Sequence, residues 1–394
     1  MIFRIMSLFL LLALFGCSAV RISYKKAENK VLDSLYDKSG TNAKKIITVL
    51  GKIHPREKKA ALYLLSHMPE KDLRYLSSQF ILDQLKWAFI ARDEFSWCSS
   101  LPDSIFFNEV LPYCNLDEDR DNWREQFYMY FQPKVKNCRT IYEAIDSVNL
   151  NIQKILGVDY NVNRSKVNIS PLQAIKEKMA TCTGLSILLI DAFRSVGIPA
   201  RIAGTPMWTN MRGNHSWVEV WINGEWYFTE YYPDGLNKSW FVEDAGKADN
   251  QKPEHRIYAA SYKPTGLYFP LVWDSLSTDI HAVNVTDRYI RLYENQQSLM
   301  TLNDDELWGE IVIFESPRSD KRISRRISVK QGETEVNFGY SPSDVDDLNR
   351  FLKIRLKKNT DYTFEFADSE GTIISAPHKT GSEKSEKIIL YVKK

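Results

Sequence analysis

One short stretch of this chain fixes its own strand pairing. Residues 215–222 and 225–230 are two runs of strand-forming residues, and Asn223-Gly224 lies between them. An Asn-Gly pair in that setting is the strongest local signal for a β-hairpin with a two-residue loop. Because the loop length sets the register, Ile222 faces Glu225, and each residue further from the loop faces its counterpart on the other strand.

The hairpin brings a histidine and an acid together. In this register Trp217 faces Glu230, so Glu230 is a diagonal neighbour of His215 on the same face of the sheet. Diagonal neighbours lie about 7–8 Å apart, a gap that a carboxylate spans to orient an imidazole. Asp234 is the other diagonal neighbour, but Pro233 cannot donate to the ladder and tends to end a strand. We predict Glu230 as the partner of His215 and keep Asp234 as the alternative.

A cysteine lies at the predicted start of a buried helix. Apolar residues repeat at helical spacing after Cys182, and Gly197 and Pro199 then end the helix. Free N–H groups and the helix dipole at that end favour a thiolate and stabilise an oxyanion. A lone cysteine is more often packing material, and a lone histidine or acid is more often structural or solvated. The conjunction of Cys182, His215 and an acid favours thiol catalysis.

These residues lie in segments that resemble the transglutaminase-like superfamily. The helix that begins at Cys182 resembles the family's nucleophile helix, and the segment ending in Glu230-Tyr231 resembles the one that ends in the third triad residue. The family usually has Asp-Pro at that point. The matching stretches are Thr-Cys-Thr-Gly at 181–184, Arg-Ser-Val-Gly-Ile-Pro-Ala-Arg at 194–201, Asn-His-Ser-Trp-Val-Glu-Val-Trp at 214–221 and Trp-Tyr-Phe-Thr-Glu at 226–230. The resemblance covers about residues 170–240 and implies a papain-like α+β core.

The resemblance implies a peptide or protein substrate, no cofactor, and an acyl-enzyme on Cys182 with His215 as the proton carrier. If water resolves the acyl-enzyme, the protein is a hydrolase, and if an amine does so, it is a crosslinking transglutaminase. We favour hydrolysis, because water is abundant outside the cytoplasm. A third hypothesis is a catalytically idle protein that binds a peptide or glycan in the same cleft. Trp208 and Trp217 are the candidate substrate-binding residues, and further aromatic candidates, which also fit core packing, are Trp221 and Trp240.

The first residues have the pattern of a lipoprotein signal peptide. Arg4 precedes an apolar run over residues 5–15 that is too short to span a bilayer. The run ends at Gly16-Cys17, which resembles a lipobox. We predict that Cys17 is the lipidated mature N-terminus, which gives contact with a membrane through the anchor. Ser18 after it resembles the pattern of outer-membrane lipoproteins. The segment from Leu101 to Arg124 resembles secreted transglutaminase-like proteins of Bacteroidetes-type bacteria, and the terminal β-domain fits their layout.

The remaining sequence divides by its periodicity into three regions. After the signal peptide at 1–17, residues 18–150 show helical apolar spacing broken by prolines. Residues 151–282 have a helix followed by strands, and the resemblance implies that this region is the catalytic core. Residues 283–394 contain short alternating runs separated by Gly, Asp, Asn and Ser, which is typical of a β-sandwich. The predicted fold class is therefore α+β.

Composition and the remaining cysteines exclude several functions. Lys plus Arg total 52 against 50 for Asp plus Glu, so nothing indicates nucleic-acid binding. The sequence has no Cys-x-x-Cys, no His-Glu-x-x-His and no Gly-rich phosphate loop, so we predict no metal and no nucleotide cofactor. Cys98, Cys114 and Cys138 are odd in number, so at most one disulfide joins them, and buried thiols are the simpler expectation.

Overall fold

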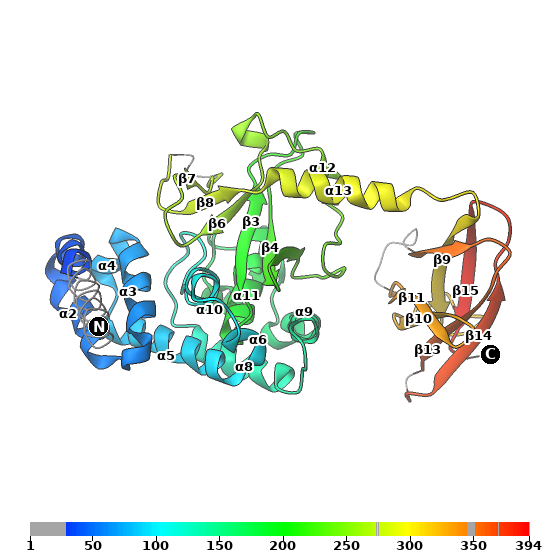
Figure 1. Ribbon diagram of the computed structural model, residues 1–394, viewed down its shortest axis with the longest axis horizontal. Helices are drawn as coiled ribbons and strands as arrows, with labels where there is room; N and C mark the ends of the chain where they lie inside the picture. The colour runs from blue at the N-terminus through cyan, green and yellow to red at the C-terminus, as the bar shows by residue number, and fades with distance from the viewer. Residues whose placement is uncertain (1–28, 273, 275, 345–350, 369, 394) are drawn as a thin grey trace, which may run out of the picture. The chain divides into compact units, whose positions relative to one another are not determined.

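A computed structural model describes residues 29–272, 274, 276–344, 351–368 and 370–393. The predicted signal peptide and its Cys17 lie outside these residues. The described residues form two compact units, which divide between Tyr293 and Glu294. Figure 1 shows that helices dominate the first part of the chain and that strands follow. The expected α+β class is confirmed, with N-terminal helices and C-terminal sheets.

Short helices form the first part of the first unit. Local capping explains several of their ends: the Thr140 hydroxyl accepts the backbone N–H of Glu143 at 3.2 Å, and Gly157 ends that helix with φ 63°. The helices are α2 (Ala43–Lys52), α3 (Lys58–His67), α4 (Glu70–Tyr75), α5 (Ser78–Glu94), α6 (Ser96–Ser99), α7 (Asp103–Ile105), α8 (Arg124–Val135) and α9 (Ile141–Leu156), with short turns η1 (Gly40–Asn42), η2 (Pro55–Glu57) and η3 (Phe106–Val110).

A six-stranded sheet and one central helix complete this unit. The strand order is β5-β4-β3-β6-β8-β7, and each paired neighbour is antiparallel. Helix α11 (Cys182–Ser195) packs on β3 and β4. The strands are β3 (Ala200–Thr205), β4 (His215–Ile222), β5 (Glu225–Thr229), β6 (Tyr258–Ser261), β7 (Leu267–Tyr268) and β8 (His281–Asn284), and the remaining elements are β1 (Asp159–Tyr160), α10 (Pro171–Glu177), β2 (Met179–Ala180), α12 (Val242–Gly246), η4 (Pro253–His255) and α13 (Thr286–Met300).

The β4–β5 hairpin has the register that its loop predicts. Ile222 pairs with Glu225 and Val218 pairs with Thr229 across the strands. Asn223 and Gly224 both have positive φ, at 50° and 102°, as a two-residue hairpin loop of this kind requires. The hairpin therefore places alternate residues of β4 on fixed faces of the sheet.

Two buried arginines tie α8 and α11 to the segment before α8. The Arg124 guanidinium donates to the backbone carbonyls of Val110, Leu111 and Pro112 at 2.8–3.1 Å. The Arg194 guanidinium donates to the carbonyl of Cys114 at 3.0 Å. Because guanidinium groups supply several donors in a fixed geometry, these two side chains satisfy the polar backbone of an irregular segment deep in the core.

The second unit is a pair of packed sheets with one shared core. One sheet has the order β11-β10-β13-β14 and the other has the order β12-β9-β15. Buried residues from both sheets form one cluster, for example Ile311 and Phe364. The bounds are β9 (Glu306–Phe314), β10 (Arg326–Gln331), β11 (Thr334–Tyr340), β12 (Leu352–Lys357), β13 (Asp361–Ala367), β14 (Ile373–Lys379) and β15 (Ser385–Tyr391).

The first unit extends to Tyr293, beyond the boundary at 282/283 that the periodicity indicated. The reason is in α13, whose first turns pack on the sheet. The Tyr289 hydroxyl donates to Glu219 at 2.7 Å and accepts from the Trp217 indole at 2.6 Å. Residues just after the strands thus belong to the same core as the strands.

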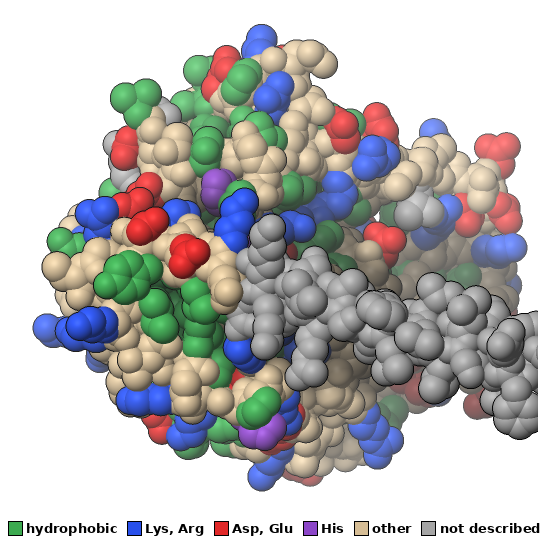
Figure 2. Space-filling view, turned by 60° about the vertical axis from the view of Figure 1, so that its left-hand side comes forward, with side chains coloured by type: hydrophobic (Ala, Val, Ile, Leu, Met, Phe, Trp, Pro, Cys, Tyr) green, Lys and Arg blue, Asp and Glu red, His purple; other side chains and the backbone are tan. Residues whose placement is uncertain are grey.

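The described surface carries charges of both signs. On the face in Figure 2, Lys and Arg side chains are interspersed with Asp and Glu side chains. Within the described part of the chain, no helix has the length and apolar character needed to cross a membrane.

Candidate active site

The structure brings Cys182, His215 and Glu230 together. Cys182 is the first residue of α11, and His215 is the first residue of β4, as the sequence predicts for both elements. Glu230 follows the last residue of β5 directly. The His215 Nε2–H donates to Glu230 Oε1 at 2.8 Å, and the ring also hydrogen-bonds Cys182. Since Nε2 donates to the carboxylate, Nδ1 is the ring nitrogen left to exchange a proton with the thiol.

The electrostatics of the pair favour a thiolate and an imidazolium. Burial acts to raise the pKa of Cys182, but the hydrogen bond and charge of His215 outweigh it, with help from the Ser216 N–H and Thr183, so the pKa is lowered. For His215, burial acts to lower the pKa, while Cys182 and Glu230 raise it, with a net value of about 9. Both shifts favour the charged forms near neutral pH.

The start of α11 supplies backbone donors beside the sulfur. The first N–H groups of a helix have no acceptor within the helix, and the helix dipole adds positive charge there. Leu185 makes the first backbone hydrogen bond of this helix, to the carbonyl of Thr181. The N–H groups before Leu185 are therefore positioned to stabilise an oxyanion formed next to Cys182.

A segment that the sequence interpretation did not use supports the acid. The Ser239 hydroxyl donates to Glu230 Oε2, the carboxylate oxygen that does not face His215. The side-chain amide of Asn149 donates to the Glu230 backbone carbonyl at 2.9 Å. Both contacts fix the position of Glu230. Ser239 lies in a loop, where no periodicity or register indicates its partner in advance.

Aromatic side chains surround His215, but not in the way predicted. Trp208 and Trp217, the candidate substrate-binding residues, are 3% and 0% exposed, so both belong to the core and neither offers a surface to a substrate. Trp240 is 61% exposed, and its ring lies 5.0 Å from the His215 ring. Phe241, the next residue, is fully buried and stacks on Trp217 at 4.4 Å. Trp240 is therefore the aromatic residue that faces outward at this site.

Asp234, the alternative third member, is exposed. The carboxylate that accepts the His215 Nε2–H is that of Glu230. A small recess of about 10 Å³ lies beside His215, with walls that include Leu116, Gly204 and Phe269. Gly204 has no side chain to fill this space, and an added Cβ would lie 2.7 Å from the His215 carbonyl oxygen.

The other described cysteines differ from Cys182. Cys98, Cys114 and Cys138 are all free thiols, so no disulfide joins the described cysteines. Burial raises the pKa of Cys98 and of Cys114 to about 12. Burial raises the pKa of Cys138 as well. Cys182 alone among these four has a lowered pKa.

Two charged residues of the sequence motifs form an ion pair behind the site. Arg201 of β3 pairs with Glu219 of β4 in the strand register, and their side chains meet at 2.8 Å. Arg288 and the Tyr289 hydroxyl also contact the buried Glu219 carboxylate. Removing one member would leave an uncompensated buried charge. These motif residues therefore hold β3, β4 and α13 together and do not touch the reacting atoms.

Within the described residues, no group of three or more His, Cys, Asp or Glu side chains could hold a metal ion. The chemistry available at the site is that of a thiolate beside an imidazolium, with backbone donors close by.

Comparison with known proteins matches part of the chain to a family model. Residues 129–231 match the model of the transglutaminase-like superfamily core, and that range contains Cys182, His215 and Glu230. The chain therefore carries a core domain of the transglutaminase-like superfamily. No curated protein sequence matches the chain.

Several solved structures show distant likeness. A candidate cysteine protease from Cytophaga hutchinsonii is 20% identical with a TM-score of 0.28, and the match covers 36% of this chain and 48% of that one. Red sea bream transglutaminase is 9% identical with a TM-score of 0.32, covering 73% of this chain and 65% of that one. This chain thus spans about half the length of the Cytophaga protein. At such scores the likeness carries no inference about activity.

Proposed function

We propose that the protein is a thiol hydrolase that cleaves peptide or other amide bonds through Cys182, His215 and Glu230. The observation that carries the proposal is the position of His215, which hydrogen-bonds the thiol on one side and the carboxylate on the other. This is the arrangement of nucleophile, base and orienting acid that covalent catalysis needs. The intact triad argues against a catalytically idle binding protein.

In the first half of the reaction the Cys182 thiolate attacks the amide carbonyl carbon. The carbonyl oxygen becomes an oxyanion, which the first N–H groups of α11 stabilise. The C–N bond then breaks, and His215 Nδ1 transfers its proton to the leaving amine. The product of this half is a thioester on Cys182, with a neutral His215 that Glu230 still orients.

In the second half a water molecule attacks the thioester while His215 accepts its proton. Collapse of the second oxyanion releases the carboxylic acid, and the thiolate–imidazolium pair is restored. An amine in place of water would give a new amide, which is the reaction of a crosslinking transglutaminase. Hydrolysis and transamidation therefore differ only in the nucleophile of this step.

The proposal is tested by incubating the protein with a peptide library, with and without a primary amine. We expect cleaved peptides from the wild type and from Cys138→Ala, which lacks only a thiol outside the site, and none from Cys182→Ala. Amine incorporation in preference to cleavage would identify a transglutaminase. Peptide binding without any Cys182-dependent product would favour the idle binding protein.

We also propose that Cys17 anchors the protein by lipid to the cell envelope, at the outer membrane. The support comes from the sequence, in which the apolar run at 5–15 ends at Gly16-Cys17. Mass spectrometry of the mature protein should show acyl chains on an N-terminal Cys17. A mature chain that starts elsewhere, or an unmodified Cys17, contradicts the anchor and leaves the catalytic proposal untouched.

A further inference from the structure

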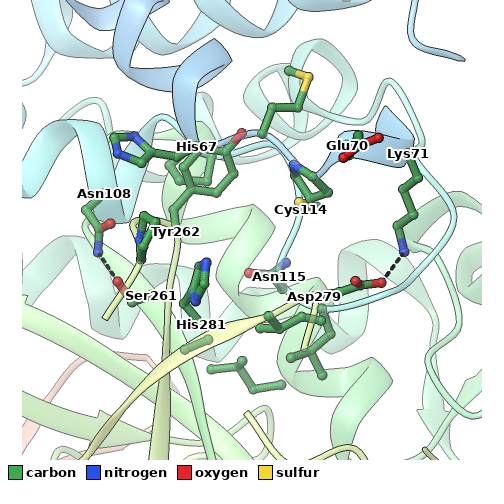
Figure 3. Close-up of a pocket in the computed structure, with 18 of the residues that line it drawn as sticks. His67, Glu70, Lys71, Asn108, Cys114, Asn115, Ser261, Tyr262, Asp279 and His281 are labelled. Atoms are coloured by element: carbon green, nitrogen blue, oxygen red, sulfur yellow. Dashed lines mark hydrogen bonds and ion pairs between the residues drawn. The ribbon is translucent and has the colours of Figure 1, made fainter. Parts of the chain in front are cut away.

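A cavity of about 290 Å³ lies in the first unit between α4 and the β6–β8 side of the sheet. Figure 3 shows His67, Tyr262 and His281 on one side of it and Lys71 and Asp279 on the other. It is separate from the recess at His215, although Leu116 lines both.

The cavity wall contains two buried acceptors without donors. The Asn115 side chain is 8% exposed, and its Nδ2 donates to Asp191 at 3.0 Å. Its Oδ1 has no hydrogen-bond partner among the residues that the structure describes, and the same holds for His281 Nδ1. Burial lowers the pKa of His281, whose ring also hydrogen-bonds the Leu267 backbone, so the neutral ring presents Nδ1 as an acceptor. Buried acceptors of this kind need a donor from a ligand or from water.

The side of the cavity that carries Lys71 and Asp279 offers charges of both signs. Lys71 Nζ lies 3.7 Å from Asp279 Oδ2, and the two side chains are 44% and 57% exposed. An exposed pair of this length contributes little to stability, so both groups are able to exchange partners. Lys38 is a further cation of the lining. The lining also includes Glu70, which pairs with Arg74, and two arginines with partners of their own, Arg120 and Arg194. The cavity therefore combines cations, two carboxylates and unpaired acceptors within a small volume.

We propose that this cavity binds a small zwitterion, a free α-amino acid or a dipeptide. The carboxylate would pair with Lys71 and Lys38, and the ammonium would donate to Asp279, Asn115 Oδ1 and His281 Nδ1. Ligand pockets usually measure about 300–1,000 Å³, so a cavity at the lower limit fits a small ligand. The site goes beyond the proposed function, because no part of it depends on the reactivity of Cys182.

Calorimetric titration of the full-length protein tests the proposal with L-alanine, L-glutamine and L-alanyl-L-alanine. We expect at least one of them to bind at millimolar concentration or below. N-acetyl-L-alanine lacks the ammonium and L-alaninamide lacks the carboxylate, so each should bind about tenfold or more weakly than L-alanine, since a charged partner is lost. Cys182→Ala should bind as the wild type does, which separates this site from the catalytic one.

Two variants test the ligand contacts that we propose for His281 and for Lys71. His281→Phe keeps an aromatic ring but removes the acceptor, and Lys71→Met removes the cation from an exposed position where folding is not at risk. Each should weaken binding by about tenfold, whereas Lys45→Met, an exposed lysine outside the cavity, should leave it unchanged. Circular dichroism checks that the variants fold. Absence of binding by all three zwitterions, or unchanged affinity in Lys71→Met, overturns the proposal.

Discussion

At the scale of single residues, the reactivity of Cys182 depends on its neighbour His215. The lowered pKa of Cys182 predicts faster alkylation by iodoacetamide near neutral pH than for Cys98 or Cys114, whose pKa values are about 12. His215→Ala removes the hydrogen bond and the charge that oppose burial, so the pKa of Cys182 should rise and alkylation should move to higher pH. Mass spectrometry of tryptic peptides over a pH series measures both effects. Equal alkylation of all the cysteines would contradict the thiolate assignment.

The same pair predicts the pH dependence of peptide cleavage. The thiolate exists above the lowered pKa of Cys182, and the imidazolium exists below the His215 pKa of about 9. The value of kcat/KM should therefore rise with pH as the thiolate forms, and it should fall as the pH passes about 9 and His215 loses its proton. The alkylation rate needs only the thiolate, so it should not fall above that pH. A cleavage rate that keeps rising above that pH would show that protonated His215 is not required.

The Glu230 carboxylate contacts His215 and Ser239, and removal of these two contacts should lower kcat/KM to different extents. Glu230→Gln removes the charge that orients His215, and we expect kcat/KM to fall by about 10²-fold without unfolding. Ser239→Ala frees only the second carboxylate oxygen, so the expected loss is at most about tenfold, with recovery in Ser239→Thr. Asp234→Asn is the matched control and should have little effect. A larger loss from Asp234→Asn than from Glu230→Gln would make Asp234 the third member.

At the scale of elements, the start of α11 depends on a close approach at Gly184. A Cβ at this position would lie 2.8 Å from Ile169 Cγ2 and 2.9 Å from the Ala180 Cβ. Gly184→Ala should therefore displace the helix start, cost about 1–3 kcal/mol of unfolding free energy and reduce Cys182 alkylation. Gly51→Ala in α2 is the control, since nothing lies within 4 Å of its added Cβ, and there better helix propensity should raise stability by up to about 1 kcal/mol. Thermal denaturation and alkylation rates together measure the difference.

The elements also show which parts of the site the sequence could predict. The hairpin register was predictable because a two-residue loop leaves one pairing, and that pairing placed Glu230 beside His215. The burial of Trp217 was not predictable, because strand alternation assigns a residue to one face of the sheet but does not indicate which segments cover that face. Phe241 and Tyr289 cover it, and both come from segments after the hairpin. Ser239 was missed for the same reason, since a returning loop has no periodicity.

At the scale of the whole molecule, the catalytic unit should retain its site without the C-terminal sheets. We predict that a chain of residues 18–293 alkylates at Cys182 as fast as the full-length protein, because the residues that hold the site lie within the first compact unit. A chain that ends at Val285 keeps all of β8 and lacks Arg288 and Tyr289, which leaves the buried Glu219 with Arg201 as its remaining charged partner and Trp217 without its acceptor. We expect the free energy of unfolding of this shorter chain to be lower by about 3–5 kcal/mol, the cost of breaking a buried charge network. The shorter chain should therefore unfold at a lower urea concentration. Urea titration of both chains gives the comparison, and equal stability would show that α13 is not part of the catalytic unit. Slow alkylation of a folded 18–293 chain would instead show that the C-terminal unit contributes to the site.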